Sequence, residues 1–204
     1  MHALIAHNLY ITCSCTIKNG EIFKNEQLIF KGEEMPDVES FLVHAYKQLH
    51  FNYPRFYKMD GLCKLGWLAV ALMLQAPAAF NYAPEEVCLL MMNSSSSLNT
   101  DLKYYHSVAT MASPALFVYT LPNIVLGEIC ISNGFKGETL FMIEPQLDKN
   151  HLHQQVNLLM QSTGHQACIF GWVELLGKEY EAKLWIVEKN NGRDGLIFTP
   201  NHLI

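Results

Sequence analysis

The chain has 204 residues, of which 50% are hydrophobic and 16% are charged, and its formal net charge at pH 7 is -5. A chain of this length and composition buries a substantial core, which excludes an intrinsically disordered protein. It contains no basic run of the kind that follows a phosphate backbone, so we expect no nucleic-acid partner.

The apolar segments predict a protein without a membrane span. The longest of them, from Leu62 to Phe80, is interrupted by Lys64, Gln75 and Pro77, which favours a buried helix over a span. The N-terminal residues contain neither a basic region nor a long apolar core, so no signal peptide is predicted. We therefore expect a cytoplasmic protein.

Six cysteines lie in apolar surroundings, and no CxxC pair occurs. This distribution is typical of reduced, buried thiols. Cys13 and Cys15 share one face of a predicted strand, but the sequence supplies no further metal ligands nearby. We therefore predict neither a metal site nor a cofactor.

The first third of the chain predicts strands followed by two helices. Leu9–Thr16 is typical of a strand, and turns at Asn19-Gly20 and Lys31-Gly32 flank short extended pieces. Asp37 is a predicted N-cap for a helix that runs to about Leu49. Apolar residues at helical spacing predict a second helix over 60–74.

The remainder alternates between strands and helices. A buried strand at 87–92 precedes a polar serine loop at 94–97, as at the carboxyl end of a parallel strand. The later elements are a helix over 98–112, a buried strand over 139–143, a helix over 151–162, and strands over 167–175 and 182–188 joined at Gly177-Lys178.

This alternation predicts an α/β fold with a single domain over 1–204. We expect a mostly parallel five-stranded sheet flanked by helices, with the last strand antiparallel at an edge.

One block of sequence resembles a known family. Ser113–Ile129, which reads SPALFVYTLPNIVLGEI, is similar to a segment of β-ketoacyl synthases, and Gly134–Gly137 is similar to that family's glycine-aromatic-x-glycine turn. The likeness runs from about Leu9 to Glu188 and implies the N-terminal half of a thiolase-like fold. Among such proteins the chain most resembles the small ketosynthase-like proteins of aryl-polyene and flexirubin clusters.

The resemblance also indicates where the nucleophile of the family would stand. Counting on from Gly137, Glu144-Pro145-Gln146 falls where condensing enzymes have Thr-Ala-Cys, so Gln146 takes the place of the nucleophilic cysteine. A shift of one residue would place Pro145 or Leu147 there instead, and neither is a nucleophile. A glutamine amide cannot form the thioester that a cysteine thiolate forms.

The resemblance implies a ketosynthase-like subunit of fatty-acid or polyene biosynthesis that is non-catalytic, or similar to a chain length factor. It would form a homodimer, or a heterodimer with a full ketosynthase, and an acyl carrier protein is a further candidate partner. Phe117, Asn123 and Gln146 are the implied substrate-binding residues. A decarboxylase or acyltransferase acting on acyl-carrier-protein substrates is an alternative, and an acyl-group binding protein is another.

These hypotheses predict different surfaces. A subunit should expose apolar residues around Phe117, Tyr119 and Leu121, together with the broad apolar face that half a fold leaves exposed. An enzyme should have a pocket at Gln146 with a titratable group within hydrogen-bond reach, and a binding protein the pocket alone. Glu144 is one such titratable candidate. His151, two residues from His153 on the predicted helix, is expected to be solvated.

Overall fold

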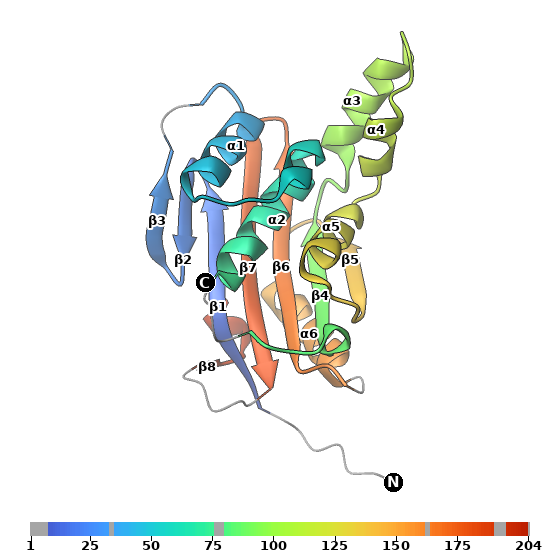
Figure 1. Ribbon diagram of the computed structural model, residues 1–204. Helices are drawn as coiled ribbons and strands as arrows, with labels where there is room; N and C mark the ends of the chain where they lie inside the picture. The colour runs from blue at the N-terminus through green and yellow to red at the C-terminus, as the bar shows by residue number, and fades with distance from the viewer. Residues whose placement is uncertain (1–7, 33–34, 76–79, 162–163, 190–194, 204) are drawn as a thin grey trace.

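A computed structural model describes residues 8–32, 35–75, 80–161, 164–189 and 195–203. One large sheet forms the middle layer (Figure 1). Helices α1, α2 and α5 cover one face, and helix α6 with the C-terminal turn η4 packs on the opposite face. The chain is thus a three-layer α/β structure with a hydrophobic core on each side of the sheet.

The predicted strands and helices follow one another in the predicted order, and α4, α5, β8 and the 3-10 helices are additional. The strands are β1 (Leu9–Lys18), β2 (Glu21–Lys24), β3 (Gln27–Lys31), β4 (Val87–Asn93), β5 (Thr139–Ile143), β6 (Ala167–Leu176), β7 (Glu179–Lys189) and β8 (Leu196–Ile197). The α-helices are α1 (Val38–Gln48), α2 (Gly61–Leu74), α3 (Leu98–Val108), α4 (Pro114–Phe117), α5 (Ile124–Asn133) and α6 (Lys149–Gln161). The 3-10 helices are η1 (Pro54–Lys58), η2 (Pro84–Glu86), η3 (Val118–Thr120) and η4 (Pro200–His202).

The sheet differs from the predicted one. It has eight strands in the order β3-β2-β1-β7-β6-β4-β5, with β8 beside β1, and it is mixed. Among the described residues, only the β4–β5 and β4–β6 pairs are parallel. The prediction of a mostly parallel five-stranded sheet was therefore wrong. The last long strand, β7, is antiparallel as predicted, but it lies between β1 and β6 rather than at an edge.

The additional strands come from a tight N-terminal meander. The turn at Asn19-Gly20 has positive φ at both residues (51° and 74°), which favours a two-residue hairpin between β1 and β2. The sequence indicated extended pieces here but not that they extend the main sheet, because strand pairing is a long-range property.

Local signals at the helix starts were more informative. Asp37 caps α1 by accepting a hydrogen bond from the Ser40 amide at 2.8 Å, as predicted, and Asp60 caps α2 in the same way through the Cys63 amide at 2.9 Å. Helix α2 is buried on nearly all sides between the sheet, α1 and α5. This burial explains the long apolar stretch at its position.

Some predicted boundaries need correction or fall outside the described residues. Helix α3 ends at Val108 rather than residue 112. Strand β5 was predicted to be buried, but it forms an edge of the sheet and is half-exposed. Pro77 and Ser162, which were expected to end helical regions, lie outside the described residues.

No single helix of the described residues is long and apolar enough to cross a membrane, although the bent pair 114–120 and 124–133 passes the same test of length and composition.

The glycine motif that resembles the ketosynthase family has a backbone role. Gly134 ends α5 in the left-handed conformation, with φ of 73°. A Cβ at Gly137 would lie 2.2 Å from the Val87 carbonyl oxygen, so this position has no room for a side chain. The motif therefore sets how closely the chain passes β4 before it enters β5.

Candidate functional site

The candidate site lies at the carboxyl ends of three parallel strands. Strand β4 runs parallel to both β5 and β6, so the segments that follow all three strands meet at one end of the sheet. The Glu144 amide, directly after β5, donates to the Asn93 carbonyl oxygen at 2.8 Å. Ligand sites of open α/β sheets occur at such strand ends, so a functional site of this chain is expected here.

The serine loop after β4 is held by its own side chains. The Glu174 carboxylate of β6 accepts hydrogen bonds from the amide and hydroxyl of Ser94, at 2.7 and 2.6 Å, and from the amide and hydroxyl of Ser95. The Asn93 side chain is buried and bonds the backbone of Ser96, whose φ is 54°. These contacts account for the serines as structural residues, in agreement with the loop prediction.

The turn between β5 and α6 has the predicted strand-to-helix form. Asp148 precedes α6 and accepts hydrogen bonds from the amides of Asn150 and His151, at 2.9 and 3.1 Å. Gln146 and Pro145 are both exposed within this turn. The residue at the implied nucleophile position is therefore accessible, but it is an amide.

One titratable pair flanks Gln146. His151 Nδ1 lies 3.3 Å from Glu144 Oε1, and its Nε2 lies 3.0 Å from the Gln155 amide nitrogen. Both ring nitrogens thus have partners, and the pair connects the start of the turn to the first turns of α6. His153 instead packs on Phe198, with ring centroids 4.5 Å apart. The two histidines diverge, as their spacing indicated.

The cysteines do not provide an alternative nucleophile. All six are free thiols, four of them buried and two half-buried. Burial raises the pKa of Cys63 and Cys168 well above the ordinary thiol value, and it also raises the pKa of Cys130. A raised pKa keeps a thiol protonated and unreactive at neutral pH.

An arm of residues 98–121, made of α3, α4 and η3, projects beyond the carboxyl end of the sheet (Figure 1). Ser113 caps α4 by accepting from the Leu116 amide at 3.3 Å, and Pro114 occupies its first turn. The aromatic rings of Tyr104 and Phe117 lie 5.5 Å apart and connect α3 to α4.

The arm carries a large share of the exposed apolar side chains. Phe117 is 60% exposed and Leu121 is 58% exposed, as predicted for an interface. The exposed large hydrophobic residues of the arm are Leu98, Leu102, Tyr105, Val108, Met111, Phe117, Val118 and Leu121. Apolar surface concentrated on one projecting element is typical of a protein–protein contact.

Tyr119 departs from that prediction because it is half-buried. Its hydroxyl donates to Glu128 Oε1 at 3.1 Å, and Arg55 donates to both oxygens of Glu128, at 2.7 and 3.1 Å. Burial and the neighbouring Glu128 carboxylate raise the pKa of Tyr119. These three residues connect η3, α5 and η1, so Tyr119 anchors the arm and does not form its outer surface.

The sheet face that carries α6 is polar where the helix does not cover it. Two rows of cross-strand neighbours occupy this region, namely Trp172, Lys183 and Thr16, and then Glu174, Glu181 and Lys18. Lys18 and Glu181 form an ion pair at 3.0 Å. The exposed large hydrophobic residues of the described strands lie instead on β3, β5 and β8 and at the end of β6. This part of the sheet therefore carries Lys183 in one row and three charged residues in the next, and it is not a broad apolar face.

The three residues implied to bind substrate do not form a pocket. Asn123 is exposed at the start of α5, Phe117 projects from the arm, and Gln146 lies in the β5–α6 turn. Three well-formed cavities of the described part of the chain lie elsewhere, and none of them is lined by these residues. Within the same residues, no group of three or more His, Cys, Asp or Glu side chains could hold a metal ion.

No known family profile and no curated protein matches the chain. Several solved structures, however, are similar to this chain. One is the ketosynthase ApeO in complex with its chain length factor ApeC from Xenorhabdus doucetiae, with a TM-score of 0.58 and 12% identity over 91% of this chain and 80% of the matched chain.

Another is AntDE:AntF, a type II polyketide synthase acyl-carrier protein in complex with its ketosynthase bound to the hexaketide. The TM-score is 0.59 and the identity 13%, over 90% of this chain and 62% of that one. The chain therefore spans less than two thirds of this second structure. Together, the two similarities show that this chain has a ketosynthase-like fold, as the Ser113–Gly137 block indicated.

Proposed function

We propose that this chain is a non-catalytic, ketosynthase-like subunit that binds a ketosynthase in the manner of a chain length factor, in fatty-acid or aryl-polyene-type biosynthesis. The observation that carries the proposal is the exposed apolar surface of the arm. This arm projects beyond the carboxyl end of the sheet, on the side where β5 forms an open edge (Figure 1).

The composition of the arm suits a protein partner. Aromatic residues and methionine are enriched in interfaces, and Tyr105, Met111 and Phe117 are all strongly exposed here. Strand β5 adds unpaired backbone groups on its outer side, which can accept a strand from another chain. In the resembled family this strand pairs across the dimer, which is consistent with its exposure here.

The turn at Gln146 supports a subunit that does not condense acyl chains. It retains the strand-to-helix geometry of a nucleophile turn, but it presents an amide, and the thiols of the chain lie elsewhere in the fold. The substitution of Gln146 for the nucleophile rests on the sequence resemblance and remains part of the proposal.

The names of the similar structures bear on the kind of partner. One is a ketosynthase with its chain length factor, and the other a ketosynthase with an acyl-carrier protein. By analogy we propose a heterodimer with a ketosynthase, and an acyl carrier protein as a further partner of that complex. A cytoplasmic location and one domain over 1–204 are parts of the same proposal.

Association can be tested with a matched pair of charge substitutions. Phe117→Asp places a charge on the arm, whereas Leu28→Asp places one on β3, at the opposite edge of the sheet, where the side chain is 51% exposed. Light scattering after size exclusion would measure complex formation with a ketosynthase from the same organism. We expect Phe117→Asp to weaken the complex at least about tenfold, because interface aromatics often contribute 2 kcal/mol or more. Leu28→Asp should leave it intact, and equal effects of the two variants would contradict the proposed surface.

An enzymatic function is the second candidate, because the Glu144–His151 pair lies beside Gln146. Incubation with malonyl-loaded and acyl-loaded carrier protein, followed by mass spectrometry, would distinguish the alternatives. We expect neither an adduct on the chain nor loss of carbon dioxide. Decarboxylation that disappears in His151→Gln would instead identify the pair as catalytic, and an adduct would identify an acyltransferase.

A further inference from the structure

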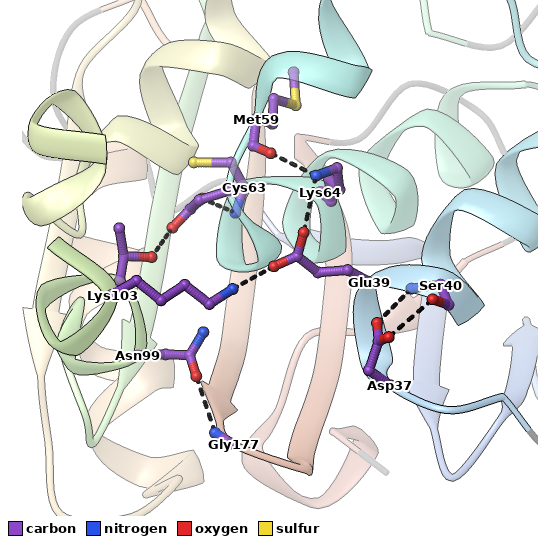
Figure 2. A network of polar contacts seen from close by, with 11 residues as sticks. Asp37, Glu39, Ser40, Met59, Cys63, Lys64, Asn99, Lys103 and Gly177 are labelled. Carbon is purple, nitrogen blue, oxygen red and sulfur yellow. Dashed lines mark hydrogen bonds and ion pairs between the residues drawn. The ribbon is translucent and has the colours of Figure 1, made fainter. Parts of the chain in front are cut away.

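The arm is attached to the body of the protein mainly by polar contacts. Thr100 is the only buried residue of α3. A helix that buries so little apolar surface gains little stability from packing, so its direction has to be set by other interactions. These other interactions are hydrogen bonds and ion pairs at the base of α3, and Figure 2 shows them.

Two consecutive residues of α3 bond to different elements. The Asn99 side-chain oxygen accepts from the Gly177 amide, in the β6–β7 turn, at 3.0 Å. The Thr100 hydroxyl donates to Asp60 Oδ2 at 2.5 Å, while Oδ1 of the same carboxylate caps α2. The Asp60 carboxylate thus caps the N-terminus of α2 and also binds the Thr100 hydroxyl of α3.

The third contact is an ion pair one turn further along α3. Lys103 donates to Oε1 of Glu39 on α1, and the other oxygen of Glu39 lies 3.3 Å from the Lys64 ammonium (Figure 2). Burial raises the pKa of Glu39, but the hydrogen bonds and charges of Lys103 and Lys64 outweigh this and lower it overall. Glu39 is therefore held in its ionised form between two cations.

The two cations differ in their access to solvent. Lys64 has a side chain only 7% exposed and also donates to the Met59 carbonyl oxygen at 2.6 Å, so it fixes Glu39 to the body. Lys103 is 47% exposed. Dissolved salt screens exposed charges far more than buried ones. The contact on the arm side is therefore the more sensitive of the two to salt.

The second leg of the arm has a separate attachment. Tyr119 in η3 bonds to the buried Glu128, and the Ser97 hydroxyl at the start of α3 donates to the Thr120 carbonyl oxygen at 2.8 Å. The Ser97 bond joins the two legs at their base, and the Tyr119 bond attaches the second leg to α5, so that any change in the direction of the arm pivots about this second attachment.

We propose that Asn99, Thr100 and Lys103 form a polar hinge, and that the Lys103–Glu39 pair is a salt-sensitive clamp that sets the direction of the arm. Because the hinge is polar, it can open and close without exposing the hydrophobic core. The inference rests on the proposed function only in that it takes the arm to be the partner-binding surface. The clamp itself is a property of the isolated chain.

Hydrogen–deuterium exchange of the isolated chain tests the clamp without a partner. We would compare the unmodified protein with Lys103→Met and with a control, Lys18→Met, which removes an equally exposed lysine from the Lys18–Glu181 pair. Exchange would be measured at about 10 mM and about 1 M salt, where the screening length falls from about 30 to about 3 Å.

In Lys103→Met, we expect amide exchange over residues 98–121 to rise about threefold to fivefold at low salt, as an exposed ion pair allows. High salt should cause the same rise in the unmodified protein and none in Lys103→Met. Lys18→Met should behave like the unmodified protein over this segment. Unchanged exchange in Lys103→Met, or a salt response that persists in it, would overturn the clamp. Thr100→Val provides an independent test of the hinge through its bond to Asp60.

The partner assay separates this inference from the proposed function. If Phe117→Asp leaves ketosynthase binding intact while Lys103→Met loosens the arm, the clamp stands and the partner surface lies elsewhere. If amide exchange over residues 98–121 is unchanged in Lys103→Met while Phe117→Asp blocks ketosynthase binding, the proposed function stands without the clamp.

Discussion

Gln146 determines what the β5–α6 turn can do. It lies exposed just before a capped helix, at a place suited to present a reactive group, but it carries an amide. An amide is neither a nucleophile nor a titratable group at neutral pH. At this position, residue identity rather than geometry limits the chemistry.

Restoring a thiol tests the accessibility of the turn. We expect Gln146→Cys to react with a disulfide reagent such as DTNB at least about tenfold faster than any cysteine of the unmodified chain, because burial raises the pKa of several natural thiols. Gln27→Cys, on the exposed strand β3, is a control for a solvent-accessible thiol. If Gln146→Cys reacts as slowly as the natural cysteines while Gln27→Cys reacts fast, the turn is not open as described.

Among the elements, the attachment of α5 to η1 depends on one buried carboxylate. Glu128 is only 2% exposed, and its partners Arg55 and Tyr119 come from separate 3-10 helices. Removing a partner from a buried charge costs more than removing an exposed pair, because the remaining charge stays desolvated.

Arg55→Ala should therefore destabilise the protein by about 2–3 kcal/mol, below the full penalty for a buried pair because the Arg55 side chain is 48% exposed. Lys18→Ala, which breaks the exposed pair with Glu181, should cost no more than about 1 kcal/mol. Urea unfolding measures both. Similar losses in the two variants would show that burial of Glu128 does not strengthen its pair.

How far the sequence predicts these elements depends on the range of the interactions. The cap at Asp37 and the Asn19-Gly20 turn are set within a few residues and were predicted, whereas the equally local cap at Asp60 was found only in the structure. The exposure of β5 was not, because TLFMI has the composition of a buried strand and its edge position depends on which distant strands pair. The polar anchor around Glu39 was also missed, since its members are up to 64 residues apart.

For the whole molecule, β6 is the strand that joins the parallel and antiparallel parts of the sheet. It pairs parallel with β4 on one side and antiparallel with β7 on the other. Within it, Gly171 has φ of 147°, and a Cβ there would lie 2.0 Å from the Lys183 carbonyl oxygen. The pairing of β6 and β7 at this point therefore leaves no room for a side chain on residue 171.

We expect Gly171→Ala to destabilise the whole fold by about 3 kcal/mol or more, through backbone strain and overpacking. Gly127→Ala is the matched control, because a Cβ there meets nothing within 4 Å and α5 should gain up to about 1 kcal/mol. Thermal or urea unfolding would show opposite signs for the two variants. A neutral Gly171→Ala would mean that the strands can separate without cost.

The two edge strands of the sheet, β3 and β5, also differ in a way that limits how many chains can assemble. Strand β3 forms one edge; it ends in Lys31 and has an irregular register with β2, and such features discourage strand addition. Strand β5 forms the opposite edge, and it is half-exposed. If β5 takes up a partner strand and β3 does not, strand addition cannot continue from the opposite edge of the sheet. Association through β5 would then stop at a closed pair of chains and would not continue into a filament.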